Sequence, residues 1–121
     1  RGTMERPFDM TELARVAGAT YTARATTYHV NLLSKLICDG ANHKGFSFIE
    51  AVTACPVAFG RRNKMGSPYD MLMWQKEHGV PVQKAEKLTP EELQGKFVIG
   101  ELYRTEAPEF TETYQRLIEG A

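Results

Sequence analysis

Residues 19–52 read ATYTARATTYHVNLLSKLICDGANHKGFSFIEAV, and this stretch decides the predicted fold. Residues 19–24 have the composition of a strand, with Tyr21 and Thr22 at its centre. Residues 46–52 form a second strand, and its apolar side chains fall on both faces, which is typical of a strand covered on both sides. A helix capped by Thr26 or Thr27 connects the two strands, and its apolar positions are Val30, Leu33, Ile37 and Ala41, widened by Leu32 and Leu36.

The flanking segments extend this pattern into an α/β layer. Asp9 and Glu12 have the spacing of a capping box for a first helix that ends at Gly18. The alternation of helix and strand with short connections predicts parallel pairing of the first two strands through a right-handed crossover. Further along, the sequence predicts a helix over 67–79, an extended linker from 81, a short helix over 89–95, a third strand over 97–103 and a final helix over 109–119.

Composition limits the classes of function. The chain has 121 residues, 42% of them apolar, and equal numbers of basic and acidic residues, so it lacks the basic excess that nucleic-acid binding requires. No run of residues is apolar enough to cross a membrane, and the two distant cysteines favour a reducing cytoplasm over a disulfide framework. A net charge of zero makes self-association plausible.

Two loops follow the predicted parallel strands, where α/β sheets place their ligands. They are residues 25–29 and 53–66, and the second is long, without the composition of a packed element. It contains Cys55-Pro56, which is either a small buried hydrophobe or a thiolate ligand of a metal or cluster. Cys38 lies among apolar residues of the predicted helix and is expected in the core.

Other polar residues have both a structural and a functional interpretation. Arg61, Arg62 and Asn63 form either a solvated turn or a cationic loop that contacts an anionic group. His29 is interpreted as a polar residue in a first helical turn. Glu50 lies in an apolar strand, so it either marks the exposed end of the strand or pairs with an arginine. Met65, Met71, Met73 and Trp74 are expected to pack or to form an interface.

Seven short motifs together resemble one family, the β subunits of 2-oxoacid (2-oxoglutarate) ferredoxin oxidoreductases. The resemblance covers residues 5–79 and resides in residues 5–9 (ERPFD), 17–24 (AGATYTAR), 26–30 (TTYHV), 43–50 (HKGFSFIE), 55–56 (CP), 59–64 (FGRRNK) and 71–76 (MLMWQK). It implies that residues 5–80 are the C-terminal half of a three-layer α/β domain of the kind that binds thiamine diphosphate, with residues 81–121 as a C-terminal extension. Residues 1–4 would be a remnant of cleavage or cloning.

The resemblance also implies an activity. Enzymes of this family oxidatively decarboxylate a 2-oxoacid on thiamine diphosphate, reduce ferredoxin through a [4Fe–4S] cluster and release an acyl-CoA, and the β subunit assembles with an α subunit. Thiamine diphosphate, Mg²⁺ and the cluster are therefore the implied cofactors of the intact enzyme. Cys55 corresponds to the fourth of its cluster ligands. Val57 departs from the family, which often has Thr at that position.

Several parts of the family pattern have no match in these 121 residues. The Gly-Asp-Gly-containing motif that holds Mg²⁺ and the diphosphate is missing, and so are three upstream cysteines. The chain is therefore expected to bind no cofactor and to be inactive alone, with no catalytic residue; Arg61, Arg62 and Asn63 remain site-lining candidates. The alternative is a non-catalytic α/β domain that docks on a partner subunit or on itself. A nucleotide-binding domain is disfavoured, because no glycine-rich phosphate loop follows a strand.

Overall fold

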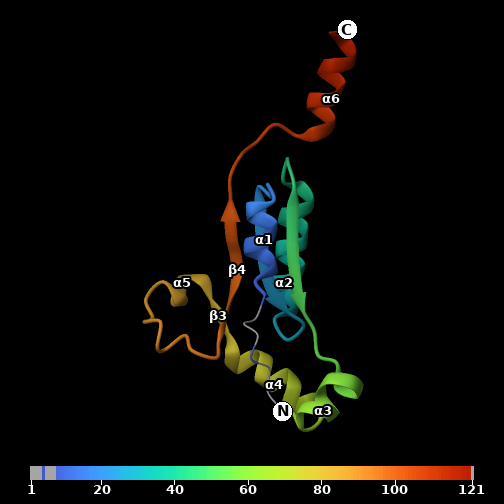
Figure 1. The fold of residues 1–121 in the computed structure, drawn as a ribbon. Coiled ribbons are helices and arrows are strands. Elements are labelled where there is room, and N and C mark those ends of the chain that lie inside the picture. Colours follow the sequence, from blue (N-terminus) through green and yellow to red (C-terminus); the bar gives the residue numbers. More distant parts are fainter. Residues whose placement is uncertain (1–3, 5–7, 121) are drawn as a thin grey trace.

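The computed structural model describes residue 4 and residues 8–120, and Figure 1 shows its ribbon. Most of the expected remnant at 1–4, and residues 5–7 of the first motif, lie outside the described residues. The elements in chain order are α1 (Met10–Val16), β1 (Tyr21–Thr26), α2 (Val30–Asn42), β2 (Ser47–Val52), the π-helical turn η1 (Pro56–Gly60), α3 (Arg61–Asn63), α4 (Pro68–His78), β3 (Gly79–Pro81), α5 (Val82–Ala85), β4 (Phe97–Arg104) and α6 (Phe110–Glu119).

The four strands form one mixed sheet in the order β2-β1-β4-β3. β1 and β2 are parallel with Ala23 opposite Ile49, β1 and β4 are antiparallel, and β3 runs parallel to β4. The predicted α/β class and the predicted parallel pair are confirmed. The strand that the sequence reading missed is β3, a strand of three residues inside the expected linker. β4 comes from the expected C-terminal extension, and it lies inside the sheet between β1 and β3.

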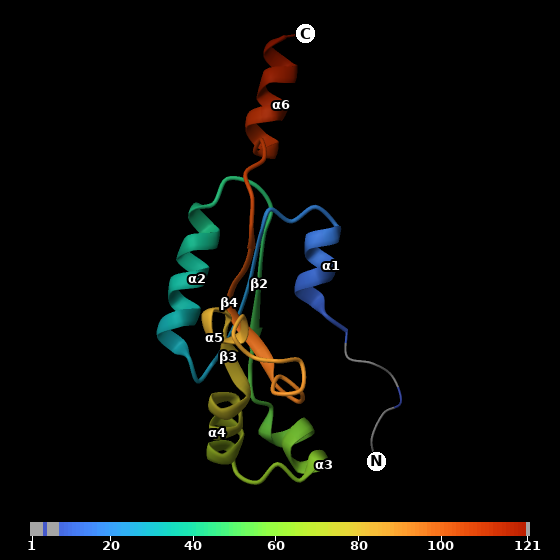
Figure 2. The same ribbon diagram turned by 90° about the vertical axis from the view of Figure 1, so that its left-hand side faces the viewer.

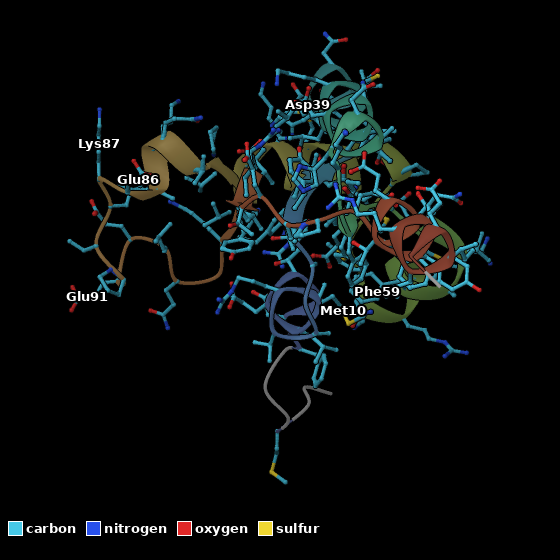
Figure 3. All side chains as sticks on the ribbon, turned by 90° about the horizontal axis from the view of Figure 1, so that it is seen from above. Met10, Asp39, Phe59, Glu86, Lys87 and Glu91 are labelled. Carbon is cyan, nitrogen blue, oxygen red and sulfur yellow. The ribbon has the colours of Figure 1, made fainter. Side chains whose placement is uncertain are left out.

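Helices cover the two faces of the sheet. Figure 2 shows α2 on one side of the sheet and α1 on the other. In the view from above in Figure 3, Asp39 of α2 and Met10 of α1 lie on opposite sides. Alternate residues of β1 serve each face. Tyr21, Ala23 and Ala25 pack with Leu36 of α2 as the core, and Arg24 points to the α1 side.

The sheet-facing row of α2 differs from the predicted one. Leu36 and Gly40 are buried, but Val30, Ile37 and Cys38 are exposed, so the expectation that Cys38 is a core thiol is wrong. The reason is a close approach at Gly40, where a Cβ atom would lie 2.7 Å from Ile49 Cδ1 and 3.3 Å from Tyr21 Cε1. The helix therefore places Gly40, which has no side chain, against the sheet. As a result, Ile37 and Cys38 face outward.

β2 contacts α2 on one face and α1 on the other, as predicted, but it is only partly buried. Among the described residues it is an edge strand that pairs only with β1. Two other local predictions need correction. α2 begins at Val30 with His29 as its N-cap, because Thr26 still belongs to β1. The expected helix over 89–95 is a series of turns, although Thr89 and Glu92 exchange the hydrogen bonds of a capping box.

Arg24 of β1 explains why the carboxylate of Glu50 lies in an otherwise apolar strand. Arg24 Nε donates to Glu50 Oε2 at 2.5 Å, and its Nη2 donates to Asp9 Oδ1 at 2.8 Å and to Thr11 Oγ1 at 3.1 Å. Only 12% of the Arg24 side chain is exposed. Of the two interpretations of Glu50, pairing with an arginine is correct, and this network joins α1 to both parallel strands.

The Asp9 carboxylate both caps α1 and pairs with Arg24. Burial would raise the pKa of Asp9, but hydrogen bonds from Thr11 and Glu12 and the Arg24 charge outweigh it, so the pKa lies below its ordinary value. A carboxyl with a depressed folded-state pKa stabilises the fold above its unfolded pKa, and that contribution disappears as the pH falls through the folded pKa.

We therefore expect Asp9→Asn to lower the free energy of unfolding by about 0.5–1 kcal/mol at pH 7, because the amide keeps a cap acceptor but loses the charge. The difference from the unmodified chain should shrink as the pH falls below about 4, where the wild-type carboxylate is protonated. Urea unfolding at pH 7, 5 and 3 measures both values, with Glu91→Gln on an exposed turn as the control. A difference that is the same at all three pH values would contradict the prediction.

Candidate functional site

The carboxyl ends of β1 and β2 lie at the same edge of the sheet, because the two strands are parallel. The segments that leave this edge are residues 27–29 after β1 and residues 53–55 after β2. The second segment leads into η1 and α3, so the expected irregular loop over 53–66 is largely helical. It returns to the sheet through α4, which lies below this edge in Figure 1.

Cys55 directly precedes η1 and is exposed. The neighbouring backbone N–H groups of Phe59 and Ala58 lower the pKa of the Cys55 thiol, with a smaller contribution from Val57 and against a weak opposing effect of burial. The Cys55 side chain itself makes no capping hydrogen bond to η1. Nearby N–H dipoles favour a thiolate over a thiol, and the thiolate is the form that binds metals. Of the two interpretations of Cys55, a small buried hydrophobe is wrong for this structure.

A cavity of about 390 Å³ lies beside Cys55. Its wall is mostly apolar and consists of Val52, Thr53, Ala54, Cys55, Phe59, Met65, Met71, Trp74 and Gln75. Met71 is buried, and Met65 and Trp74 line the same cavity, while Met73 lines a separate hollow with Lys64 and Asp70. Met65, Met71 and Trp74 therefore share the wall of the cavity beside the Cys55 segment.

Gln75 is a site residue that the sequence analysis did not single out. It is 2% exposed, and its Oε1 accepts from Thr27 Oγ1 at 3.1 Å and from the backbone N–H of Tyr28 at 2.9 Å. The side chain thus connects α4 to the segment that follows β1. The signal in the sequence was a polar residue next to Met and Trp in the segment that forms α4. A buried amide must find hydrogen-bond partners, so such a residue indicates a contact with another element.

His29 lies in the same segment. Its ring Nδ1 is 2.8 Å from Thr26 Oγ1, and burial lowers its pKa, which favours the neutral ring at pH 7. This agrees with its interpretation as a structural polar residue at the start of a helix.

The cationic candidates lie apart from the cavity. Arg61, Arg62 and Asn63 form α3, are exposed, and do not line the hollow beside Cys55. Asn63 Nδ2 donates to the carbonyl of Phe59 at 2.9 Å, and the left-handed residue Lys64 ends the helix. Asn63 therefore closes the local turn, and a binding role for Arg61 and Arg62 stays a prediction.

Within residues 4 and 8–120, no three His, Cys, Asp or Glu side chains come together as a metal site. In the same part of the chain, no helix is both long and apolar enough to span a membrane.

The stabilising role of the Gln75 hydrogen bonds can be tested by substitution. Gln75→Met keeps the length of the side chain but removes the acceptor of both the Tyr28 N–H and the Thr27 hydroxyl, so we expect a loss of about 1–3 kcal/mol in the free energy of unfolding for the two hydrogen bonds. Urea denaturation measures this loss, and the exposed Gln94→Met is the matched control. Equal stability of Gln75→Met and Gln94→Met would refute the role of Gln75.

Comparison with known proteins places the chain. No family model matches it. It is 46% identical over 118 residues to the 2-oxoglutarate synthase subunit KorB of Methanothermobacter marburgensis and 44% identical over 118 residues to that of Methanocaldococcus jannaschii. These alignments cover 98% of this chain but 41% and 44% of the relatives, so the chain spans about two fifths of their length.

A solved structure has the same fold. It is a 2-oxoglutarate:ferredoxin oxidoreductase from Magnetococcus marinus with 2-oxoglutarate, coenzyme A and succinyl-CoA bound, with a TM-score of 0.73 at 23% identity. The match covers 98% of this chain and 41% of the solved chain. By sequence and by fold, the chain belongs to the family of 2-oxoglutarate (2-oxoacid) ferredoxin oxidoreductase β subunits, of which it represents a part.

Proposed function

We propose that this chain is the part of a β subunit that completes an iron–sulfur site in an enzyme that oxidatively decarboxylates 2-oxoglutarate or a related 2-oxoacid. The observation that carries the proposal is 46% identity over nearly the whole chain to a 2-oxoglutarate synthase subunit. In the intact enzyme, the reaction would yield an acyl-CoA and reduced ferredoxin, with thiamine diphosphate and Mg²⁺ as further cofactors.

The geometry at Cys55 fits a cluster ligand. The thiol is exposed in the segment that follows β2, the nearby backbone N–H groups lower its pKa, and Pro56 restricts the backbone that follows it. A [4Fe–4S] cluster would supply one-electron transfer when bound. Cys55 can provide one of its four thiolate ligands, and the other three would come from outside these 121 residues, because Cys38 lies on the exposed surface of α2.

Thiamine diphosphate has no candidate anchor in this chain. The Gly-Asp-Gly-containing motif is missing from the sequence, and Arg61, Arg62 and Asn63 lie on α3, outside the cavity beside Cys55. We propose that the cofactor and its Mg²⁺ are held by other parts of the subunit, and that the chain by itself is inactive.

Partner binding is the second candidate function, and α6 favours it. Its apolar residues Phe110, Tyr114, Leu117 and Ile118 are 55–76% exposed, and Figure 1 shows the helix projecting away from the sheet. The ion pair of Lys44 with Glu112, at 2.6 Å, ties α6 to the segment before β2. An exposed apolar face of this kind is typical of a surface that another chain covers. The α subunit is the partner we propose, with ferredoxin and coenzyme A as ligands of the whole enzyme; self-association and a cytoplasmic location stay predictions.

Substitution of the two cysteines in the intact subunit tests the cluster proposal. We expect Cys55→Ala to lower the iron content and to remove most of the broad absorbance near 400 nm, because one of four ligands is lost. Cys38→Ala is the matched control and should leave both unchanged. If Cys38→Ala bleaches the protein and Cys55→Ala does not, the assignment is wrong.

A second measurement tests the isolated chain. Calorimetric titration of the 121-residue chain with thiamine diphosphate and Mg²⁺ should give no saturable heat, because the residues that hold the diphosphate are outside it. The intact subunit or enzyme, titrated in the same buffer, is the positive control. Saturable binding to the isolated chain in the micromolar range would contradict the prediction.

A further inference from the structure

The backbone of Gly60 lies directly against the sulfur of Met71. A Cβ atom at Gly60 would be 2.7 Å from Met71 Sδ, 3.4 Å from Met71 Cε and 3.5 Å from the carbonyl oxygen of Cys55. Gly60 has φ −60°, a helical value that any residue adopts, so its conformation does not require glycine. A side chain at Gly60 would instead have to displace the sulfur of Met71.

Gly60 also closes the turn that begins at Cys55. Its N–H donates to the Cys55 carbonyl at 2.9 Å, and its own carbonyl accepts from the N–H of Met65 at 3.0 Å. The first of these bonds encloses residues 56–59 and ends on the Cys55 backbone itself. A displacement of Gly60 therefore moves the Cys55 backbone with it.

Met71 connects this turn to the body of the sheet. It is 4% exposed, and its side chain also lines the cavity beside Cys55. Gln75, one turn later on α4, is hydrogen-bonded to the segment that follows β1. The sulfur of Met71 therefore lies between Gly60 and a helix that is bonded to the segment after β1.

We propose that Gly60 and Met71 are positioning residues for Cys55, and that their contact determines where the thiol lies relative to the sheet. The contact transmits the position of β1, through Gln75 and α4, to a cysteine that follows β2. This inference rests on the proposed function only where it speaks of a cluster, since the contact itself is independent of what the thiol binds.

The test is a double-mutant cycle in the intact, cluster-loaded subunit. The variants are Gly60→Ala, Met71→Ala and the double variant, with Gly120→Ala at the exposed end of α6 as the control. The readouts are the rate of iron loss to a chelator and the midpoint potential of the cluster. Residues that orient a metal ligand typically contribute about 10- to 100-fold to affinity, so we expect Gly60→Ala to lose iron about tenfold faster, with a shifted potential.

The cycle distinguishes a specific contact from general damage. Met71→Ala removes the wall beside Gly60 and should show a smaller loss than Gly60→Ala. The double variant should be no worse than Met71→Ala alone, because the added methyl group then fills the space that the sulfur left. Additive effects, or iron retention in Gly60→Ala equal to that of Gly120→Ala, would overturn the inference. If Gly60→Ala does not fold, unchanged iron retention in Met71→Ala overturns it.

A separate measurement tests the Gly60–Met71 contact if the cluster proposal is wrong. If Cys55→Ala leaves the cluster intact, the proposed function is wrong, and the contact is then judged by amide hydrogen exchange in the 121-residue chain. Faster exchange at residues 57–60 in Gly60→Ala, reversed in the double variant, would support the positioning role. Unchanged exchange would overturn it.

Discussion

β1 has a neighbour on every side, and the rest of the structure depends on this constraint. It is hydrogen-bonded to β2 on one edge and to β4 on the other, with α2 on one face and α1 on the other. Small residues make such enclosure possible: Ala23 and Ala25 are fully buried and let Leu36 of α2 reach the sheet. Gly40 serves the same purpose from the helix side, where a side chain would meet Ile49 and Tyr21.

A charged residue in a strand this enclosed must be compensated. Arg24 faces the α1 side, and the carboxylates of Asp9 and Glu50 and the hydroxyl of Thr11 surround its guanidinium. An arginine left without these partners in a site that is 12% exposed would cost several kcal/mol. The compensation also has a structural effect, because its partners come from α1 and from β2. The network therefore holds the first helix and both parallel strands in one arrangement.

The candidate site follows from the parallel pairing of β1 and β2. Parallel strands end at the same edge, so Cys55 and the segment containing Tyr28 emerge side by side, and α4 bridges them through Met71 and Gln75. The site is open on its outer side, since Cys55 and Phe59 are exposed. Exposed apolar side chains recur on α1, at Met10, Leu13 and Val16, and on α6. Surfaces of this kind fit a chain that spans about two fifths of its relatives, in which further residues and a partner subunit would cover them.

The sequence by itself determined the main helices and strands of the sheet and the parallel pair, because hydrophobic periodicity and short connections are local properties. It also singled out Cys55, through its place at the end of a strand and the order of motifs around it. Tertiary structure alone decided which side of each element is buried. Cys38 and Ile37 appear to belong to an apolar helical stripe, yet the close contact at Gly40 rotates them outward. Glu50 had two interpretations until the register placed it opposite Arg24. Gln75 stood out only as a polar residue among Met and Trp, and Gly60 gave no signal, since their roles depend on partners 47 and 11 positions away, and such contacts form only when the chain has folded.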